Sequence, residues 1–426
     1  MFLSFDRVTV AALMVVTGSP LWAVEPLTMP EAQRLAVARS PSLLAQDALT
    51  VAAREQAVAA AQPPDPVLKL GIDNLPVNGA DRLSLTRDFM TQRRIGVMQE
   101  IPRAEKRQLR AERLERDAQR TQLQRQLTLS RVQRDTALAW LERYYTQAQR
   151  ELVLRQIDEA GLQVQAAELA FRTGRGSQVE VFAARAAAIA LRDRLGEIDR
   201  QSRNAVFTLA RWVGAEAAER PLAGSPPWQD PPLRGEVSRE HLRSHPEVLA
   251  AGAEIDAAET DARLARANKQ SDWSVEASYS QRGPAYSNMI SVGVSIPLQW
   301  DPKSRQDREL AAKLAMAEEA KARYEDMQRS HEAEVLGLLN DWQTGKERLA
   351  RYSDELIPVA RQRSEAALTS YRSGKGELAG VLAARRDEIE VRLQALALEL
   401  ETARSWAQLH FVAPDHGVAT SHQEQP

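Results

Sequence analysis

A glycine-containing segment that occurs twice constrains the fold of this chain more than any other feature. The first copy, F-R-T-G-R-G-S-Q-V-E-V-F-A-A-R, begins at Phe171, and the second, Y-R-S-G-K-G-E-L-A-G-V-L-A-A-R, begins at Tyr371. The two copies align without a gap. Glycine supplies the backbone angles that a tight turn between antiparallel helices needs. The repeat therefore predicts one helical hairpin that is built twice.

The stretch before each copy predicts an unusually long helix. Residues 104–173 contain no proline and one glycine, Gly161. At a rise of 1.5 Å per residue, a helix over this stretch is roughly 105 Å long. Apolar residues recur at steps of three and four, as at Leu138, Leu141 and Tyr145, and the same rhythm continues in the second half up to Val359. We expect helical hairpins over about 104–212 and about 304–411, with the second long helix running unbroken from 304 to 373.

Two pairs of short strands precede the hairpins. Apolar and polar residues alternate in each strand, as at Leu68, Leu70 and Ile72. The expected strands cover about 67–74, 93–101, 272–280 and 289–297. Four short strands cannot close a barrel, but three copies of the chain supply twelve. The pattern predicts a mainly α fold with a small β part, in which four strands per chain contribute to a trimeric, twelve-stranded transmembrane β-barrel.

The ends and the middle of the chain fit an exported protein made of two repeats. Residues 1–23 have the pattern of a signal peptide, with Arg7, an apolar run from Val8 to Val16 and Ala23 before the cleavage point. An uncleaved apolar helix is the alternative. Prolines gather in 213–238, which predicts a connector with little regular structure. We expect structural repeats over 24–212 and 239–411 and a disordered tail over 412–426.

Composition and motifs exclude several classes of protein. Charged residues make up 27% of the chain and aromatic residues 5%, which suits long helices better than thick cores. The formal net charge is −2, so there is no basic excess for a nucleic-acid partner. The sequence has no cysteine and therefore neither a disulfide nor a lipidated cysteine. It contains no triad of Ser, His and Asp and no phosphate-binding loop, and neither an enzyme nor a cofactor is predicted.

The histidines do not predict a metal site. His241 and His245 have the i, i+4 spacing of paired ligands on a helix. Pro246 disfavours a helical conformation at His245, however, and so argues against that pairing. His331 lies in a charged stretch of helix and is expected at the surface.

The layout of helix, two strands, long helix, glycine-containing tip and return helix, made twice, resembles the TolC family of outer-membrane efflux proteins. The motifs that carry the resemblance are the two tips, the helix starts Ser40-Pro41 and His245-Pro246, and the strand ends Ile101-Pro102 and Ile296-Pro297. The first strand region, D-P-V-L-K-L-G-I-D-N-L-P, is more similar to the heavy-metal branch of CzcC and CusC proteins. The absence of cysteine departs from the many family members that carry a lipidated N-terminal cysteine.

The resemblance implies a homotrimeric duct in the outer membrane that joins a periplasmic adaptor and an inner-membrane pump, in the heavy-metal branch a pump of the RND type. Adaptor contacts would fall at the tips, on Arg172, Gly174, Arg175, Gly176, Arg372, Gly374, Lys375 and Gly376. A simple turn between helices is the other interpretation of these residues.

Three carboxylates, Glu180, Glu377 and Asp341, are candidates for a lumen or gate. In a trimer each would form a ring of three negative charges that favours cations. The alternative for Glu180 and Glu377 is a carboxylate that stabilises a helix start. Two kinds of function stay open at this point: an export channel, whose substrate is heavy-metal cations, drugs or, in type I export, proteins, and a soluble periplasmic coiled-coil scaffold.

Overall fold

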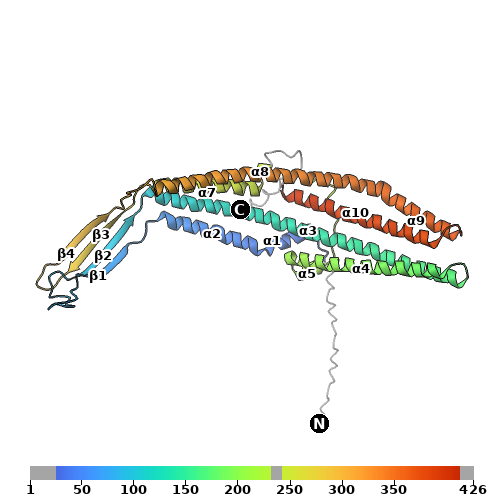
Figure 1. Ribbon diagram of the computed structural model, residues 1–426, viewed down its shortest axis with the longest axis horizontal. Coiled ribbons are helices and arrows are strands. Elements are labelled where there is room, and N and C mark those ends of the chain that lie inside the picture. The colour runs from blue at the N-terminus through green and yellow to red at the C-terminus, as the bar shows by residue number, and fades with distance from the viewer. Residues whose placement is uncertain (1–24, 232–241, 413–426) are drawn as a thin grey trace, which may run out of the picture.

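The computed structural model describes residues 25–231 and 242–412, which form one elongated body (Figure 1). A four-stranded sheet lies at one end, and the turns of two helical hairpins lie at the other. The expected signal peptide, most of the expected tail and the last part of the connector lie outside these residues. None of the helices within them combines enough length with enough hydrophobicity to cross a lipid bilayer.

The helices of the first half begin and end where local signals place them. α1 (Met29–Ala38) and α2 (Pro41–Ala61) are separated at Ser40, whose side chain accepts a hydrogen bond from the N–H of Leu43 at 3.4 Å. Proline fits the first turn of α2 because the N–H groups there have no partner within the helix. α3 (Ala104–Arg172) is continuous over 69 residues, and α4 (Gln178–Val213) returns beside it. The long first helix is confirmed.

The described part of the connector is more ordered than its prolines predict. Gly214, with a φ of +93°, ends α4 and is followed by the short helix α5 (Ala215–Glu219). Leu222 then forms a parallel β-bridge with Leu27, and the N–H of Leu27 donates to the carbonyl of Pro221 at 2.7 Å. These ties connect segments far apart in the sequence, so local composition does not reveal them.

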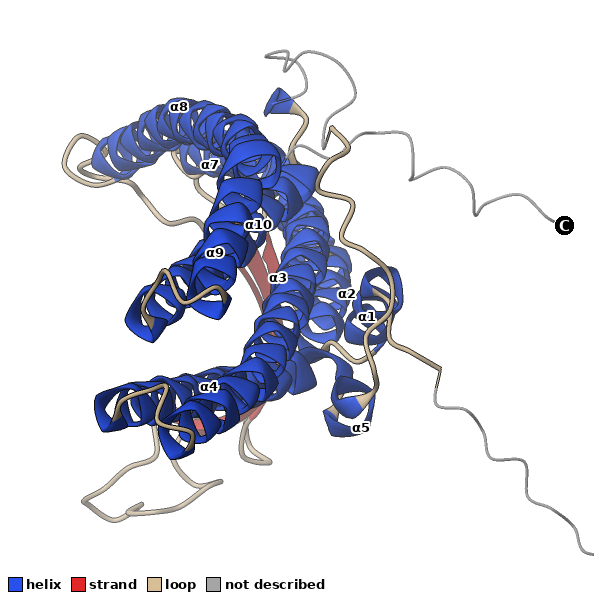
Figure 2. Ribbon diagram, turned by 90° about the vertical axis from the view of Figure 1, so that its right-hand side faces the viewer, coloured by secondary structure: helices blue, strands red, loops and turns tan. Residues whose placement is uncertain are grey.

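The second half repeats this order. The helix α7 (Pro246–Ala267) precedes two strands, and a long helical arm and the return helix α10 (Leu378–Val412) follow them. Viewed from the hairpin end, the helices form a curved layer with the turns of both hairpins in front (Figure 2).

The long arm of the second half is interrupted, contrary to the expected single helix over 304–373. α8 (Gln306–Arg351) passes into the π-helical turn η1 (Tyr352–Leu356) and then into α9 (Ile357–Arg372), and the N–H of Ile357 donates to the carbonyl of Tyr352, five residues earlier. Pro358 lacks an N–H, and its ring collides with the carbonyl four residues before it, which explains the change of hydrogen bonding. The turn shifts the helix face, so Leu356 and Val359, expected in the apolar seam, are 45% and 61% exposed.

The two halves meet inside one antiparallel sheet. Its strands are β1 (Val67–Asp73), β2 (Gln92–Ile101), β3 (Trp273–Gln281) and β4 (Met289–Ser295), in the order β1-β2-β3-β4. β2 of the first half pairs with β3 of the second, and Ile95 faces Tyr279 across that pair. The same register places Leu70 opposite Ile95 and Tyr279 opposite Ile290. All four strands were expected near these positions.

The largest group of buried side chains lies where α1, α3, α4, α5, α8 and α10 meet. Three tryptophans of this group fasten other segments through their indole N–H groups. Trp140 donates to the carbonyl of Leu27 at 3.0 Å, Trp342 to that of Trp228 at 2.7 Å and Trp406 to that of Asp230 at 3.1 Å. The N-terminal segment and the connector are thereby held against the long helices.

Candidate functional site

The tips, residues 173–177 and 373–377, have the same backbone hydrogen bonds. In the first tip the N–H of Gly174 donates to the carbonyl of Phe171 at 3.0 Å, and the N–H of Arg175 donates to that of Ala170 at 2.9 Å. The second tip repeats both bonds around Gly374, each at 3.0 Å. This pair of bonds is the Schellman motif, which ends a helix around a residue in the left-handed region. The φ values of the two central glycines are +70° and +73°, so the predicted identity of the two turns is confirmed.

The second glycine of each tip has a different role from the first. A Cβ on Gly176 would lie 3.0 Å from the Cβ of Ala170, and a Cβ on Gly376 would lie 2.8 Å from the Oγ of Ser370. A Cβ on the first glycine of either tip would meet nothing within 4 Å. The first glycine therefore supplies a backbone angle, and the second lets the chain pass close to the preceding helix.

Basic side chains of both tips point into solvent. Arg172 is 76% exposed and lies 3.7 Å from Oε2 of Glu168, one helix turn earlier. Arg175 donates from Nε to the hydroxyl of Thr173 at 3.4 Å. Exposed contacts of this length add little stability, so these cations are available to a partner. The charged residues expected at the docking tips are all exposed: Arg172, Arg175, Arg372 and Lys375.

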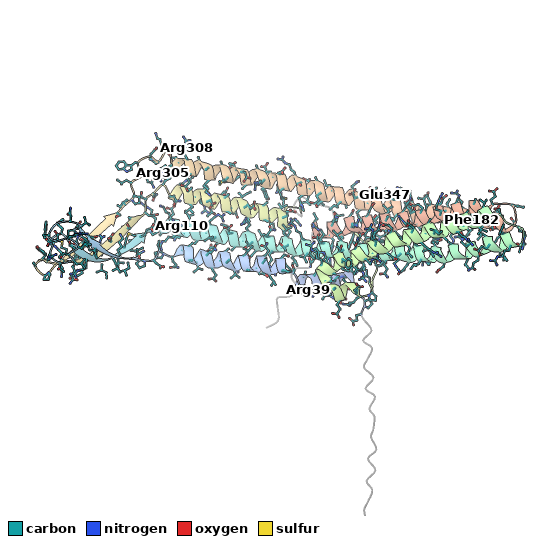
Figure 3. The ribbon with its side chains drawn as sticks, turned by 60° about the horizontal axis from the view of Figure 1, so that its bottom comes forward. Arg39, Arg110, Phe182, Arg305, Arg308 and Glu347 are labelled. Carbon is teal, nitrogen blue, oxygen red and sulfur yellow. The ribbon has the colours of Figure 1, made fainter. Side chains whose placement is uncertain are left out.

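The first tip exposes more apolar surface than the second. Phe171 is 48% exposed and Phe182 is 56% exposed, and Phe182 lies near the hairpin end of the molecule (Figure 3). Their counterparts in the second hairpin, Tyr371 and Leu382, are half-buried. The two copies are thus alike in backbone and unequal in the surface they offer.

The three predicted lumen or gate carboxylates lie in different settings. Glu180 accepts a hydrogen bond from the N–H of Ser177 at 2.8 Å, and the hydroxyl of Ser177 accepts one from the N–H of Glu180 at 3.3 Å, which completes a capping box. This is the helix-start role that the sequence left as the alternative. Glu377 is exposed just before α10. Asp341 is exposed on α8 and borders a cavity of about 510 Å³ between α8 and α10.

A buried carboxylate between the hairpins was missed by the sequence reasoning. The side chain of Glu388 on α10 is 4% exposed and accepts hydrogen bonds from Arg385 at 3.1 Å and Arg392 at 2.8 Å. Arg385 also lies 3.7 Å from Glu159 on α3, which links the two hairpins. The signal was present in the i, i+3 and i, i+4 spacing of these three residues. A cavity of about 770 Å³ lies beside them, lined by α3, α4 and α10.

One face of the sheet carries apolar side chains on all four strands, with Arg93 and Gln99 of β2 among them. The side chains on this face are paired from strand to strand, as are Val97 with Ala277 and Ala277 with Val292. Ile290 is 79% exposed and Leu70 is 70% exposed, so nothing in the described chain covers this face. The described residues also provide no partner for the outer edge of β1 or of β4.

The opposite face of the sheet is polar and carries ion pairs. Lys69 of β1 lies 2.5 Å from Glu276 of β3, and Arg94 of β2 lies 3.1 Å from Asp73. Ser278 and Ser280 are buried on this side. The sheet therefore separates an apolar from a polar environment.

Histidines from two helices meet at the start of α7. His245 is the N-cap of α7, as Pro246 predicts, and its ring stacks on that of His331 from α8 with centroids 4.5 Å apart. His331 is 2% exposed, so its expected place at the surface is wrong; the charge of its sequence neighbours does not show which helix face is covered. Burial lowers the pKa of His245 to about 4, and the His331 ring adds to this effect. Burial also lowers the pKa of His331.

The same place brings a third possible ligand residue beside the two histidines, although the sequence did not predict a metal site. Ligand atoms of His245, Glu247 and His331 all lie within 4.8 Å of one another. His241, the partner considered for His245 from the sequence, lies outside the described residues.

Long paired hairpins that end in a two-faced sheet are the arrangement found in TolC-like outer-membrane channel structures. Residues 237–413 match the family model described as outer membrane efflux protein. No curated protein matches the sequence.

Solved structures match nearly the whole chain. CusC covers 96% of this chain and 98% of its own, with a TM-score of 0.79 and 14% identity. A membrane protein from Pseudomonas aeruginosa covers 90% of both chains, with a TM-score of 0.76 and 16% identity. The CmeC outer membrane channel of Campylobacter jejuni covers 96% of this chain and 93% of its own, with a TM-score of 0.75 and 12% identity. The TM-scores show a shared fold, and at identities this low the matches show the fold alone. The TolC-like fold inferred from the motifs is confirmed.

Proposed function

We propose that this chain is the outer-membrane channel subunit of a tripartite efflux system and has no enzymatic activity. The observation that carries the proposal is the arrangement along the molecule. An uncovered apolar sheet face lies at one end, and two helix turns with the same backbone hydrogen bonds and exposed cations lie at the other. The apolar face suits lipid, and the turns suit a protein partner. The family match of the second half supports the same function.

The channel is a homotrimer in this proposal. β4 of one copy pairs with β1 of the next, because both edges lack partners in the described chain. Three copies then close a twelve-stranded barrel with the apolar face toward lipid and the polar face toward water. The helices extend from the barrel as a tube in the periplasm, and the outer membrane surrounds the barrel.

The tips dock a periplasmic adaptor, which connects the channel to an inner-membrane pump of the RND type. The exposed basic residues of both tips supply charge-assisted hydrogen bonds, and Phe171 and Phe182 add apolar contact at the first tip only. In a trimer the six tips would alternate between two kinds, so an adaptor ring would meet two different surfaces.

The exported substrates include heavy-metal cations in this proposal, following the resemblance of the sequence to CzcC and CusC proteins. Exposed Glu377 and Asp341 are the carboxylates that could form rings toward a lumen. Glu180 is the weakest of the three candidates because its carboxylate already caps α4. Drugs and type I protein substrates are the alternatives for the same channel.

Cell fractionation followed by crosslinking tests the channel against the scaffold. We expect the protein in the outer-membrane fraction as a trimer that detergent releases. A soluble, monomeric protein in the periplasm would refute the channel and support the scaffold.

Deletion of the gene tests the substrate. We expect greater sensitivity to one or more of copper, silver, zinc, cobalt and cadmium, restored by the wild-type gene. Sensitivity to dyes and antibiotics alone would refute metal export and leave the channel in place.

A matched pair of variants tests the docking step. Arg372→Ala should weaken adaptor capture. Arg329→Ala, which replaces an exposed arginine on α8 far from the tips, should not.

A further inference from the structure

The strongest feature without a role so far is the buried imidazole of His331. Its side chain is 2% exposed, and neither Nδ1 nor Nε2 has a hydrogen-bond partner among residues 25–231 and 242–412. Buried polar groups nearly always have a partner, and an unpaired one costs stability. If this position only packed against α7, a leucine there would make the fold more stable than a histidine does. The ring therefore points to a ligand that satisfies one of its nitrogens.

We propose that His245, Glu247 and His331 bind a divalent transition-metal ion such as zinc, which fastens the start of α7 to α8. Two imidazoles and one carboxylate form a ligand set typical of zinc. The ligand atoms lie within 4.8 Å of one another, whereas a tetrahedral site with bonds of about 2.0–2.1 Å places them roughly 3.3 Å apart. The rings of His245 and His331 are stacked with an interplanar angle of 20°, so closure around the ion requires the rings to rotate until their nitrogens converge on it.

The hydrogen bonds of His245 indicate which of its nitrogens would bind. Nε2 lies 3.3 Å from the carbonyl of Phe411, which places the ring proton on Nε2. Nδ1 then accepts a long hydrogen bond, also 3.3 Å, from the N–H of Glu247. Metal-binding histidines commonly donate their other N–H to a carbonyl in this way. Nδ1 is the ligand atom, and the bond it gives up is a weak one.

The carboxylate of Glu247 forms an ion pair with Arg131, which competes with a bound metal ion. Its Oε1 lies 3.4 Å from a guanidinium nitrogen of Arg131, and its side chain is 28% exposed. The pair is long and partly solvated, so it holds the carboxylate weakly. The positive charge of Arg131 still lowers the affinity of the site for a metal ion, and removal of this charge should raise that affinity.

An ion reaches the cluster from the side of Glu247. A cavity of about 330 Å³ is lined by residues of α3, α7, α8 and α10, among them His245, Glu247 and Glu334. A water molecule from this cavity completes four-coordination. The absence of thiolate in the cluster favours Zn²⁺, Co²⁺ or Ni²⁺ over Cu⁺, and the imidazoles disfavour Mg²⁺.

The site differs in position and purpose from the carboxylates considered for a lumen. Its two histidines are buried between helices, and the contact with Phe411 ties in the end of α10. A metal there would hold together α7, α8 and α10, whatever the channel transports. The inference does not depend on metal export: a drug channel with this cluster would bind zinc as well.

Metal titration of the purified, tag-free, chelator-treated protein in detergent tests the proposal. We expect one Zn²⁺ per chain, at least about 100-fold tighter than Mg²⁺. Co²⁺ should give the visible absorption bands of a four-coordinate ion, and X-ray absorption of the zinc form should show two imidazoles. Either an absence of zinc binding or a shell of oxygens alone overturns the proposal with the unaltered protein.

Two variants locate the site. His245→Asn keeps a good N-cap, and His331→Leu fills the same space without polar atoms. Each should lose zinc affinity by about 10-fold or more. The control His416→Gln/His422→Gln, which removes the tail histidines, should bind zinc as the wild type does, and Arg131→Gln should bind it more tightly. Zinc binding that persists in His331→Leu and disappears in the tail control overturns the assignment.

Stability measurements guard against a misfolded variant. Without metal, His331→Leu should unfold at the same temperature as the wild type or higher, since it removes two unpaired buried nitrogens. With zinc, the wild type alone should gain stability. A zinc-dependent gain of the same size in His331→Leu also contradicts the proposal.

Discussion

The contact between α8 and α10 at Gly345 allows a sharp test of how closely the helices pack. A Cβ on Gly345 would lie 3.1 Å from both Cβ and Cγ2 of Thr402 and still closer to its Oγ1. Thr402 is 2% exposed, and its hydroxyl donates to the carbonyl of Leu398 at 2.8 Å. Rotation of the threonine does not relieve the clash, because its own Cβ is one of the crowded atoms.

The substitution Gly345→Ala therefore sets two effects against each other. Overpacking of a tight helix contact costs about 1–3 kcal/mol. Replacing glycine by alanine within a helix returns up to about 1 kcal/mol through the unfolded chain and helix propensity. We expect a net loss of roughly 1–2 kcal/mol.

Thr402→Ala supplies the matched partner. Alone it leaves a small void and loses about 1 kcal/mol. Combined with Gly345→Ala it removes Oγ1 and Cγ2, so the double variant should be more stable than the sum of the single losses by about 1 kcal/mol. Gly337→Ala is the control, because a Cβ there meets nothing within 4 Å.

The assay is the thermal unfolding midpoint of the purified wild type and the four variants in one detergent. Gly345→Ala should lower the midpoint, Gly337→Ala should not, and the double variant should recover part of the loss. Additive losses in the double variant would refute the close approach of α8 and α10, and an unchanged Gly345→Ala would refute it more directly.

Three further outcomes are expected. Gly174→Val should impair export while the trimer stays in the outer membrane, because a β-branched residue at φ +70° costs about 1–2 kcal/mol locally. Gly161→Val on α3 is the control. Loss of the trimer in Gly174→Val would instead show that the tip is needed for folding. Burial raises the pKa of Glu399 in the folded protein. The contribution of Glu399 to stability is therefore present below its pKa in the unfolded chain and is lost as pH rises through its pKa in the folded protein. The unfolding midpoint of Glu399→Gln should rise relative to that of the wild type between pH 4 and pH 8, and a constant difference would contradict this. Pro358→Ala should restore α-helical hydrogen bonding over residues 352–357 and slow amide hydrogen exchange there, whereas unchanged exchange would show that the π turn has another cause.

The parts of the fold that follow from local signals could be predicted. Glycines at positive φ define both tips, and period-two alternation defines all four strands. The π turn was harder to foresee, although Pro358 is visible in the sequence. The steps of three and four continue through Leu356 and Val359, since a heptad pattern counts residues and not hydrogen bonds.

The parts that depend on distant contacts could not be predicted. His331 stands among charged residues, and only the packing of α7 against α8 shows that its face is covered. The tie of Leu27 to Leu222 joins the N-terminal segment to the connector and leaves no local pattern. The charged group around Glu388 had a visible helical spacing, but its link to Glu159 depends on how the hairpins pack.

The apolar sheet face and the free edges of β1 and β4 set a kinetic problem for a single copy of the chain. Until other copies bind, each newly made chain exposes to water an apolar surface and two unpaired strand edges, at which incorrect strand pairing can occur. In the proposed trimer, correct assembly needs three chains to meet, and its rate rises steeply with their concentration near the membrane. Aggregation competes over the same interval. The lifetime of the monomer therefore governs the yield of correctly assembled protein. Chaperones or slow synthesis should change this yield more than the stability of the assembled trimer does.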